Sequence, residues 1–117
     1  MNHVAYAQET REEVLRGADI MRDHDIFIEF GPSRHGISEA FFLYVYEPGG
    51  NRVEIYSGGY LNFAPDWGPI KWYLSEHPGT YWSGELSESV VSYATPPVAS
   101  PGTKPKGGFS NAYRSET

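Results

Sequence analysis

Four short stretches of apolar residues, separated by polar turns, cover much of the first 57 residues of this chain. They are rich in β-branched and aromatic side chains and are bounded by Gly, Pro, Asn, Asp or Ser, which is typical of strands. The four stretches are residues 2–8, 26–30, 38–46 and 52–56. Between the first two, residues 11–22 have a helical period. Its apolar side chains at i, i+4 and i+7 are Val14, Ala18 and Met21, so the predicted order is β-α-β-β-β.

Local signals define where the helix begins and where the second strand ends. Thr10 and Glu13 form a capping box, in which the Thr10 side chain accepts from the third helical amide and Glu13 reaches back. Gly31 and Pro32 are predicted to end the second strand, because this pair marks turns and loops.

The third and fourth strands are predicted to form a hairpin through the turn residues 47–51. A loop of odd length would place Tyr44 opposite Glu54, so that both side chains share one face of the hairpin.

The composition changes after the fourth strand. Residues 60–95 hold all three Trp among scattered Pro, Gly and Tyr, which predicts an irregular wrap with a short helix near Ser75. Residues 96–117 are rich in Pro, Gly, Ser and Lys and are predicted to be disordered. The predicted organisation is a βαβββ module over 1–59, the wrap over 60–95 and the tail over 96–117.

Length and composition exclude several classes of function. The chain of 117 residues is long enough for one domain, and its net charge of -6 argues against a nucleic-acid partner, since phosphate binding needs a basic patch. No apolar run is long enough to cross a membrane, and the N-terminus does not look like a secretory signal. The absence of cysteine excludes disulfides and thiolate metal sites, so any metal must be held by His, carboxylate or water. These features together predict a cytoplasmic protein.

Four residues of the module have side chains suited to chemistry: His3, His35, Tyr44 and Glu54. Histidine and carboxylate bind metals such as Fe(II), and histidine and tyrosine move protons. Taken singly, each has a plain structural interpretation, and strand alternation alone would leave Glu54 as an exposed charge. Tyr46 is predicted to point the same way as Tyr44, so the sequence does not choose between them. The pairing is more informative, because the first and fourth strands of such a unit can direct a His and a Glu onto one concave face.

The chain from His3 to about Pro97 resembles the type I extradiol ring-cleavage dioxygenases, most closely the catechol 2,3-dioxygenases. The signature is a histidine, a spacer, an apolar residue and tyrosine, an acid-proline pair, a glycine and a glutamate. It is met by His35, Leu43, Tyr44, Glu47, Pro48, Gly50 and Glu54. The family has a small residue two positions before the histidine. Ser33 occupies that position here and departs mildly from the family pattern.

The resemblance implies an α+β fold of the vicinal oxygen chelate type, in which paired βαβββ modules form a curved sheet around Fe(II), with Mn(II) as the alternative metal. It implies that the module over 1–59 binds this metal through His3 and Glu54. It also implies that His35 and Tyr44 bind substrate or assist proton transfer. The implied reaction is extradiol cleavage of catechol or a substituted catechol with O2 to a 2-hydroxymuconate semialdehyde.

In that family a third ligand, a histidine, comes from the preceding module, and another active-site histidine also lies upstream of the position matching His3. Neither is in this sequence. We therefore expect the C-terminal part of a dioxygenase, inactive or weak by itself and dependent on an upstream module or on homo-oligomerisation. Two alternatives stay open. A homodimer with a two-His, two-Glu site would be a glyoxalase-like isomerase or lyase, and a small-molecule-binding module would not be an enzyme, although a binder does not need His35, Tyr44 and Glu54.

Overall fold

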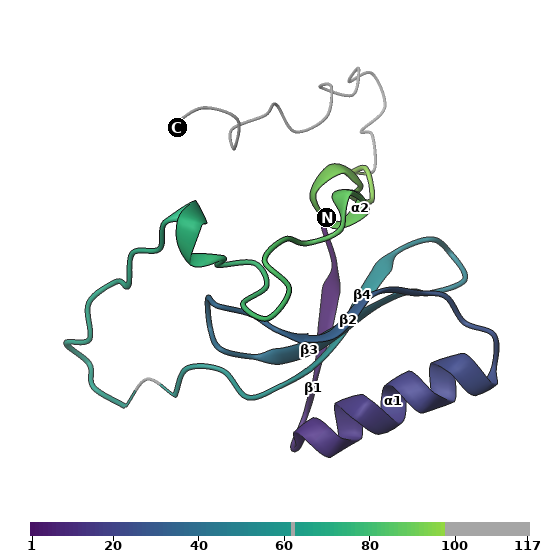
Figure 1. Cartoon of the computed structure of the whole chain (residues 1–117), viewed down its shortest axis with the longest axis horizontal. Helices are drawn as coiled ribbons and strands as arrows, with labels where there is room; N and C mark the ends of the chain where they lie inside the picture. Colours follow the sequence, from purple (N-terminus) through teal and green to yellow (C-terminus); the bar gives the residue numbers. More distant parts are fainter. Residues whose placement is uncertain (62, 98–117) are drawn as a thin grey trace.

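The computed structural model of the chain describes residues 1–61 and 63–97. The elements follow the predicted order β-α-β-β-β and continue with two short helical segments. They are β1 (Val4–Gln8), α1 (Arg11–Asp23), β2 (Ile28–Arg34), β3 (Phe41–Tyr46), β4 (Arg52–Ser57), the 3-10 helix η1 (Leu74–Glu76) and α2 (Glu88–Ser92). Figure 1 shows α1 on one side of the sheet. The segment after β4 loops away from the sheet and returns as α2 beside the N-terminus.

The four strands form one sheet in the order β1-β4-β3-β2. β1 runs parallel to β4, with Ala5 beside Glu54, while β3 is antiparallel to both β4 and β2. The first and last strands of the module are therefore neighbours. This arrangement brings the residue just before β1 close to the middle of β4, although about fifty positions separate them in the sequence.

The two faces of the sheet bury two separate apolar clusters. On the α1 side the cluster is built around Val14, Phe41, Leu43 and Val45. On the opposite side it is built around Phe42, Tyr44 and Val90, and Val90 comes from α2. Because successive residues of β3 point to opposite faces, this one strand supplies the centre of both clusters. The face opposite α1 is therefore covered in part by the C-terminal wrap.

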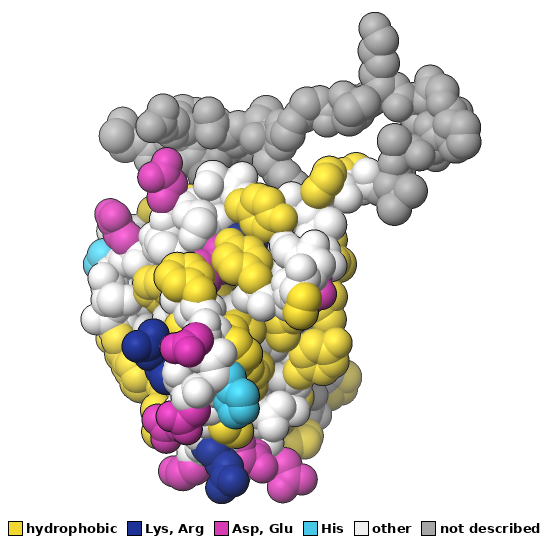
Figure 2. Space-filling model, turned by 90° about the vertical axis from the view of Figure 1, so that its right-hand side faces the viewer, with side chains coloured by type: hydrophobic (Ala, Val, Ile, Leu, Met, Phe, Trp, Pro, Cys, Tyr) yellow, Lys and Arg dark blue, Asp and Glu magenta, His cyan; other side chains and the backbone are white. Residues whose placement is uncertain are grey.

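Helix α1 begins as the capping box predicts. The Glu13 amide donates to the Thr10 hydroxyl at 3.3 Å, and the Thr10 amide donates to the Glu13 carboxylate at 3.0 Å. Val14 is the fully buried residue of the helix, and Ala18 and Met21 pack against the same cluster. Figure 2 shows charged side chains gathered at the lower end of the view, where α1 lies, and hydrophobic side chains above them.

The prediction that Gly31 and Pro32 end the second strand is wrong, because β2 continues to Arg34. Phe30 pairs with Tyr44 and Ser33 pairs with Phe42, so the ladder contains a register shift between these positions. Gly31 has a φ of 97°, and a Cβ there would lie 2.7 Å from the Phe42 carbonyl oxygen. The pair therefore forms an irregularity inside an edge strand, where a proline can be accommodated.

The third strand begins at Phe41, later than predicted. Ser38 and Glu39 have φ values of 66° and 60°, which strand backbone does not adopt, so they belong to the connecting loop. The predicted hairpin register is confirmed, because Tyr44 pairs with Glu54. The first strand also begins slightly later than predicted, at Val4, which leaves His3 immediately before it.

A buried arginine connects the sheet to both ends of the described chain. Arg52 has no exposed surface and makes an ion pair with Glu29, at 2.5 Å between Nε and Oε2. Its Nη atoms also donate to the carbonyl oxygens of Asn2, Tyr93 and Ser89, at 3.0, 2.8 and 2.8 Å. One guanidinium therefore joins β2, the residue before His3 and the α2 segment.

The C-terminal wrap is mostly irregular, as predicted. The short helix expected near Ser75 is confirmed as η1, whereas α2 was not predicted. The predicted disordered tail over 96–117 lies outside the described residues from position 98 onward, and the three-part division of the chain stays a prediction. No helix among residues 1–61 and 63–97 has the length and apolar character needed to cross a bilayer.

Candidate metal centre

The four side chains chosen from the sequence come together on the sheet face opposite α1. Glu54 lies in the middle of β4, and each of its carboxylate oxygens faces one histidine. His3 Nε2 lies 3.0 Å from Oε2, and His35 Nε2 lies 3.0 Å from Oε1. The Tyr44 hydroxyl lies 3.5 Å from the same His35 nitrogen. The predicted convergence of His3 and Glu54 is confirmed, while the roles of the four residues stay predictions.

Glu54 is not the exposed charge that strand alternation alone suggests. It lies on the face opposite Val53 and Ile55, but only 6% of its surface is exposed. Burying a carboxylate is unfavourable unless partners compensate it. The groups that face Glu54 among the described residues are the two imidazoles, which compensate its charge only when they carry a proton on Nε2.

His3 is oriented by the residue before it. The Asn2 amide oxygen lies 2.7 Å from His3 Nδ1, and the Asn2 amide nitrogen donates to the Val90 carbonyl at 3.1 Å. Because an amide oxygen only accepts, the proton of a neutral His3 resides on Nδ1. Nε2, which faces Glu54, is then free to bind a metal. Asn2 was not predicted as part of the site; its one signal in the sequence is its position next to a candidate ligand.

His35 is held by the wrap and by β3. Its Nδ1 lies 2.6 Å from the Gly79 carbonyl oxygen, and its ring stacks on Phe42 with centroids 3.7 Å apart. The carbonyl accepts, so Nδ1 keeps its proton and Nε2 is the atom able to hold or release one. Gly79 was not predicted as part of the site, because a backbone carbonyl contributed 44 residues away leaves no trace in the local sequence.

The structure distinguishes between the two candidate tyrosines. Burial, and secondarily the charge of Glu54, raise the pKa of Tyr44 well above the ordinary value of a phenol. Tyr44 therefore keeps its hydroxyl proton at neutral pH and can donate it in a hydrogen bond. Tyr46 instead donates to Glu29 in the buried Arg52 network, so it has no part in the histidine cluster.

The donor set of this cluster suits a divalent metal but is incomplete. Two adjacent ligands, each about 2.1 Å from one ion, lie about 3.0 Å apart when they subtend a right angle. The distance between His3 Nε2 and Glu54 Oε2 in the structure is also 3.0 Å. The outer hydrogen bond on His3 Nδ1 is also the arrangement typical of metal-bound histidine. Within residues 1–61 and 63–97, no group of three or more His, Cys, Asp or Glu side chains is placed to hold one ion.

A hollow of about 550 Å³ lies over the cluster. His3, His35, Tyr44 and Glu54 line it together with residues of the loops that follow β2 and β4. The hollow is large enough for a small aromatic molecule, because small-molecule sites occupy roughly 300–1,000 Å³.

The chain is similar in sequence to several known proteins. Residues 1–55 match the model of the Glyoxalase/Bleomycin resistance protein/Dioxygenase superfamily. The chain is 51% identical over 104 residues to the manganese-dependent 2,3-dihydroxybiphenyl 1,2-dioxygenase of Geobacillus genomosp. 3, covering 87% of this chain and 30% of that relative. It is 44% identical over 80 residues to the metapyrocatechase of Geobacillus stearothermophilus, covering 68% of this chain and 24% of that relative.

Solved structures show the same likeness. Homoprotocatechuate 2,3-dioxygenase from Arthrobacter globiformis matches with a TM-score of 0.76 and 34% identity, over 82% of this chain and 31% of that structure. An extradiol ring-cleaving dioxygenase from B. fuscum matches with a TM-score of 0.78 and 30% identity, over 87% of this chain and 29% of that structure. The chain therefore spans less than a third of the length of these relatives.

Proposed function

Because the chain has the glyoxalase/vicinal oxygen chelate fold and its homologues are extradiol dioxygenases, we propose that it forms the metal-binding part of an enzyme that cleaves catechol-type diols with O2. The proposed products are 2-hydroxymuconate semialdehydes, formed by opening the ring beside the diol. The observation that carries the proposal is the Glu54 carboxylate, which is buried and faces His3 and His35 at 3.0 Å each.

His3 Nε2 and Glu54 Oε2 are the proposed ligands of Fe(II), with Mn(II) as the alternative that the manganese-dependent Geobacillus relative supports. His3 and Glu54 would hold such an ion, which would supply a Lewis acid where a diol and dioxygen could meet and would offset the negative charge of the deprotonated diol. The chain's own contribution is to fix the two donors. Asn2 orients the imidazole, and the pairing of β1 with β4 fixes its distance from the carboxylate.

His35 and Tyr44 are the proposed proton-handling residues. His35 Nδ1 is fixed on the Gly79 carbonyl, so Nε2 is the atom that takes a proton from the diol or returns one to the product. Tyr44 keeps its proton because burial and the nearby Glu54 charge raise its pKa, so its hydroxyl can donate to a substrate oxygen. The stack on Phe42 keeps the imidazole in the hollow where both groups meet the substrate.

The third ligand is proposed to come from outside the described residues, from an upstream module of a longer polypeptide. A two-fold dimer is the second candidate, with one His and one Glu from each copy and isomerase or lyase chemistry. It is favoured by one observation: β1 is an edge strand on which Val4 and Tyr6 are exposed, so another copy could pack there. A cytoplasmic location belongs to the same proposal.

The test combines metal content, native mass and turnover. The chain is loaded with Fe(II) in the absence of oxygen, once alone and once with the upstream region of the manganese-dependent Geobacillus genomosp. 3 relative added in trans. Each sample is then given catechol in air. The proposal is supported if the chain and the upstream region together bind iron and form a yellow product. Iron bound by a dimer of the chain without product supports the isomerase, and absence of both iron and product contradicts metal-dependent catalysis.

A matched pair of variants ties the result to the site. Glu54→Gln keeps the size of the side chain but removes its charge, and is expected to abolish iron binding. Glu88→Gln changes an exposed carboxylate at the start of α2 and is expected to bind iron as the parent does.

A further inference from the structure

A short part of the C-terminal wrap, residues 78–81, lies against the loop that carries His35, and we call it the clamp segment. The two backbone amides that follow His35 both donate to the Pro78 carbonyl, at 3.1 and 3.0 Å. The Tyr81 amide donates to the carbonyl of the residue before His35, at 2.8 Å. These bonds hold the clamp segment at both of its ends, on either side of the histidine.

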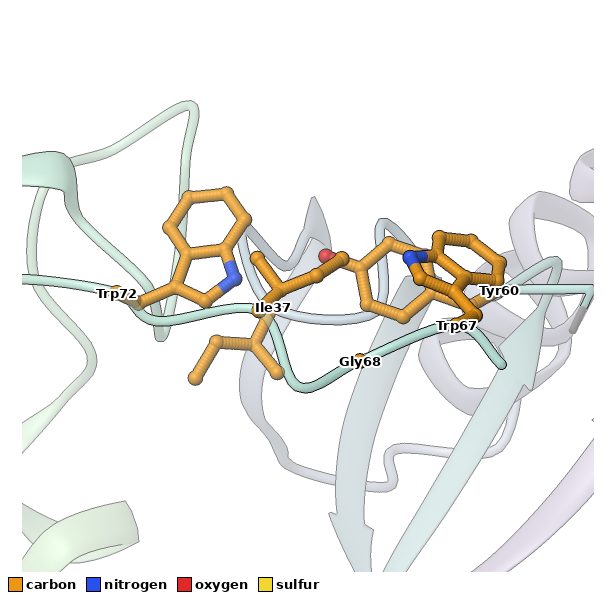
Figure 3. Close-up of a pocket in the computed structure, with 6 residues that line it drawn as sticks. Ile37, Tyr60, Trp67, Gly68 and Trp72 are labelled. Carbon is orange, nitrogen blue, oxygen red and sulfur yellow. The ribbon is translucent and has the colours of Figure 1, made fainter. Parts of the chain in front are cut away.

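The wrap approaches this loop closely because the residue after His35 is a glycine. A Cβ added at Gly36 would lie 2.8 Å from the His77 carbonyl oxygen and 3.2 Å from the Trp72 ring. Figure 3 shows Trp72 on one side of Ile37, the next residue of the loop. Backbone and side chains of the wrap therefore pack directly on the loop of His35.

The atom of the clamp segment that meets the His35 ring is the Gly79 carbonyl oxygen, 2.6 Å from Nδ1. A Cβ at position 79 would lie 2.8 Å from Leu86 Cδ1, so a glycine lets the wrap pack closely here. A glycine also leaves the peptide bond between residues 79 and 80 freer to rotate than another residue would. The backbone bonds of the clamp segment are made by residues 78 and 81, so they do not fix the direction of this carbonyl.

Thr80 supplies the missing constraint. It is only 1% exposed, and its hydroxyl lies 2.9 Å from the hydroxyl of Ser33, a residue of β2 that is 4% exposed. The Thr80 hydroxyl also lies 2.9 Å from that of Ser83, and one hydroxyl can donate and accept at the same time. Because a buried hydroxyl without a partner is unfavourable, the bond to Ser33 ties the residue after the Gly79 carbonyl to the sheet.

The direction of the Gly79 carbonyl decides which nitrogen of a neutral His35 carries the proton. With the carbonyl in place, the proton lies on Nδ1, and Nε2 is free to accept one. Without it, the remaining acceptor is the Glu54 carboxylate, whose Oε1 lies 3.0 Å from Nε2. The proton would then move to Nε2, and this atom would no longer be able to take a proton from a diol.

We propose that Thr80 is a positioning residue for His35. Through its bond to Ser33 it directs the Gly79 carbonyl at Nδ1 and so keeps Nε2 as the proton acceptor. Ser33 is also the position at which the chain departs mildly from the family pattern, and the structure gives its hydroxyl this partner. The inference rests on the proposed function for the role of Nε2, whereas the hydrogen bonds themselves require neither metal nor turnover.

The experiment measures the tautomer of His35 by NMR in the full chain, free of metal and labelled with 15N-histidine. Spectra are recorded at about pH 9, where ordinary imidazoles are neutral, and a His35→Gln variant assigns the signals. The parent is expected to show the form protonated at Nδ1. Thr80→Val keeps the shape of the side chain without its hydroxyl, and should lower the ratio of the Nδ1 to the Nε2 form by about tenfold or more. An unchanged ratio, or a parent protonated at Nε2, would overturn the proposal.

Two controls separate positioning from a general loss of structure. His77 Nδ1 lies 2.8 Å from the Gly84 carbonyl oxygen, so the His77 ring signals report whether the segment between these two residues is folded. They should be unchanged by the valine. Thr95→Val is the matched variant, because it removes another hydroxyl of the wrap, bonded to Asn51 at 2.6 Å. It should leave the tautomer of His35 as in the parent.

A serine and a change on the opposite side of the bond complete the test. Thr80→Ser keeps the hydroxyl and should keep the Nδ1 form of His35. If the valine also alters the His77 signals, Ser33→Ala decides, because it removes the partner hydroxyl from β2 and leaves the wrap unchanged in sequence. A lower ratio for His35 with unchanged His77 signals then supports the proposal, and any other result overturns it.

The link to catalysis is tested on the chain combined with the upstream region. Thr80→Val is expected to lower kcat for catechol by about tenfold and to leave KM and the iron content unchanged, since neither proposed ligand is altered. If the tautomer ratio falls and kcat does not, His35 is not the proton acceptor, and that part of the proposed function fails while the positioning inference stands. An unchanged tautomer ratio overturns the positioning inference whatever the iron content.

Discussion

Replacing Arg52 by methionine is expected to cause a large loss of stability, because it leaves buried partners without compensation. The guanidinium is fully buried and holds the Glu29 carboxylate through two hydrogen bonds, at 2.5 and 2.7 Å. It also donates to three backbone carbonyls, at the residue before His3 and in the α2 segment. Arg52→Met therefore leaves a buried carboxylate with neutral hydroxyl donors, from Tyr46 and Ser89, in place of a cationic partner.

The magnitude follows from the cost of an unpaired buried charge. Removing one partner of a buried ion pair costs about 3–5 kcal/mol, against a total stability of about 5–15 kcal/mol for a domain. The pair between Arg34 and Glu39, at 3.2 Å, is more exposed, with 21% and 59% of the two side chains accessible, and serves as the control. Arg34→Met should cost about 1–2 kcal/mol, including the loss of its contact with the Tyr81 ring. The double change of Glu29 and Arg52 to methionine should cost less than Arg52→Met alone, because no charge is then left unpaired.

The measurement is urea unfolding followed by far-UV circular dichroism at pH 7 and at pH 4. Burial alone would raise the pKa of Glu29, but hydrogen bonds from Arg52 and Tyr46 and the Arg52 charge outweigh burial and lower it. A lowered folded pKa stabilises the protein above the unfolded pKa, and this contribution is lost as pH falls through the folded pKa. The effect of Arg52→Met should therefore be smaller at pH 4. A loss at pH 7 no larger than that of Arg34→Met would refute the reasoning.

Three further predictions concern the site and the backbone that supports it. In the chain combined with the upstream region, Tyr44→Phe should keep the iron content and slow turnover, because it removes a proton donor and no ligand. Loss of iron would assign Tyr44 a different role. Asn2→Ala should weaken metal binding about 10–100-fold in a competition assay with a chelator, because His3 loses its outer hydrogen bond; an unchanged affinity would contradict this. Gly31→Ala should lower stability by about 1–3 kcal/mol through its φ of 97° and its contact with a carbonyl, whereas Gly17→Ala in α1 should raise it by up to about 1 kcal/mol. The midpoints of urea unfolding measure both variants. Stability changes of the same sign for Gly31→Ala and Gly17→Ala would contradict the prediction.

The parts of the fold that the sequence predicted are those fixed by local interactions. The helix start depends on Thr10 and Glu13, which lie within one turn. The pairing of Tyr44 with Glu54 follows from the length of one tight turn. The continuation of β2 beyond Gly31 was missed, because a Gly-Pro pair has the same local signature whether it ends a strand or interrupts it. Only the partner strand, through Ser33 and Phe42, decides between these outcomes.

The candidate site divides in the same way. Side chains whose chemistry is unusual for a strand, such as His3 and Glu54, could be selected from the sequence. Asn2 and Gly79 could not, because they act on the histidines through an amide and a backbone carbonyl. The short helix α2 was missed for a related reason. Its five residues carry no helical period, and its position depends on Arg52 contacts that join distant segments.

The two buried carboxylates of the sheet differ in the kind of partner that the fold supplies. Glu29 is paired with Arg52, whose guanidinium stays charged at neutral pH and well above it. Glu54 is equally buried, but its charged partners among the described residues are His3 and His35, which are cationic only when protonated. When the imidazoles are neutral with their protons on Nδ1, the Nε2 atoms that face Glu54 do not donate to it, and its charge has no paired cation among the described residues. A divalent ion bound by Glu54 and the neutral His3 would supply the missing positive charge, which is why Glu54, and not Glu29, is the carboxylate that we assign to the metal.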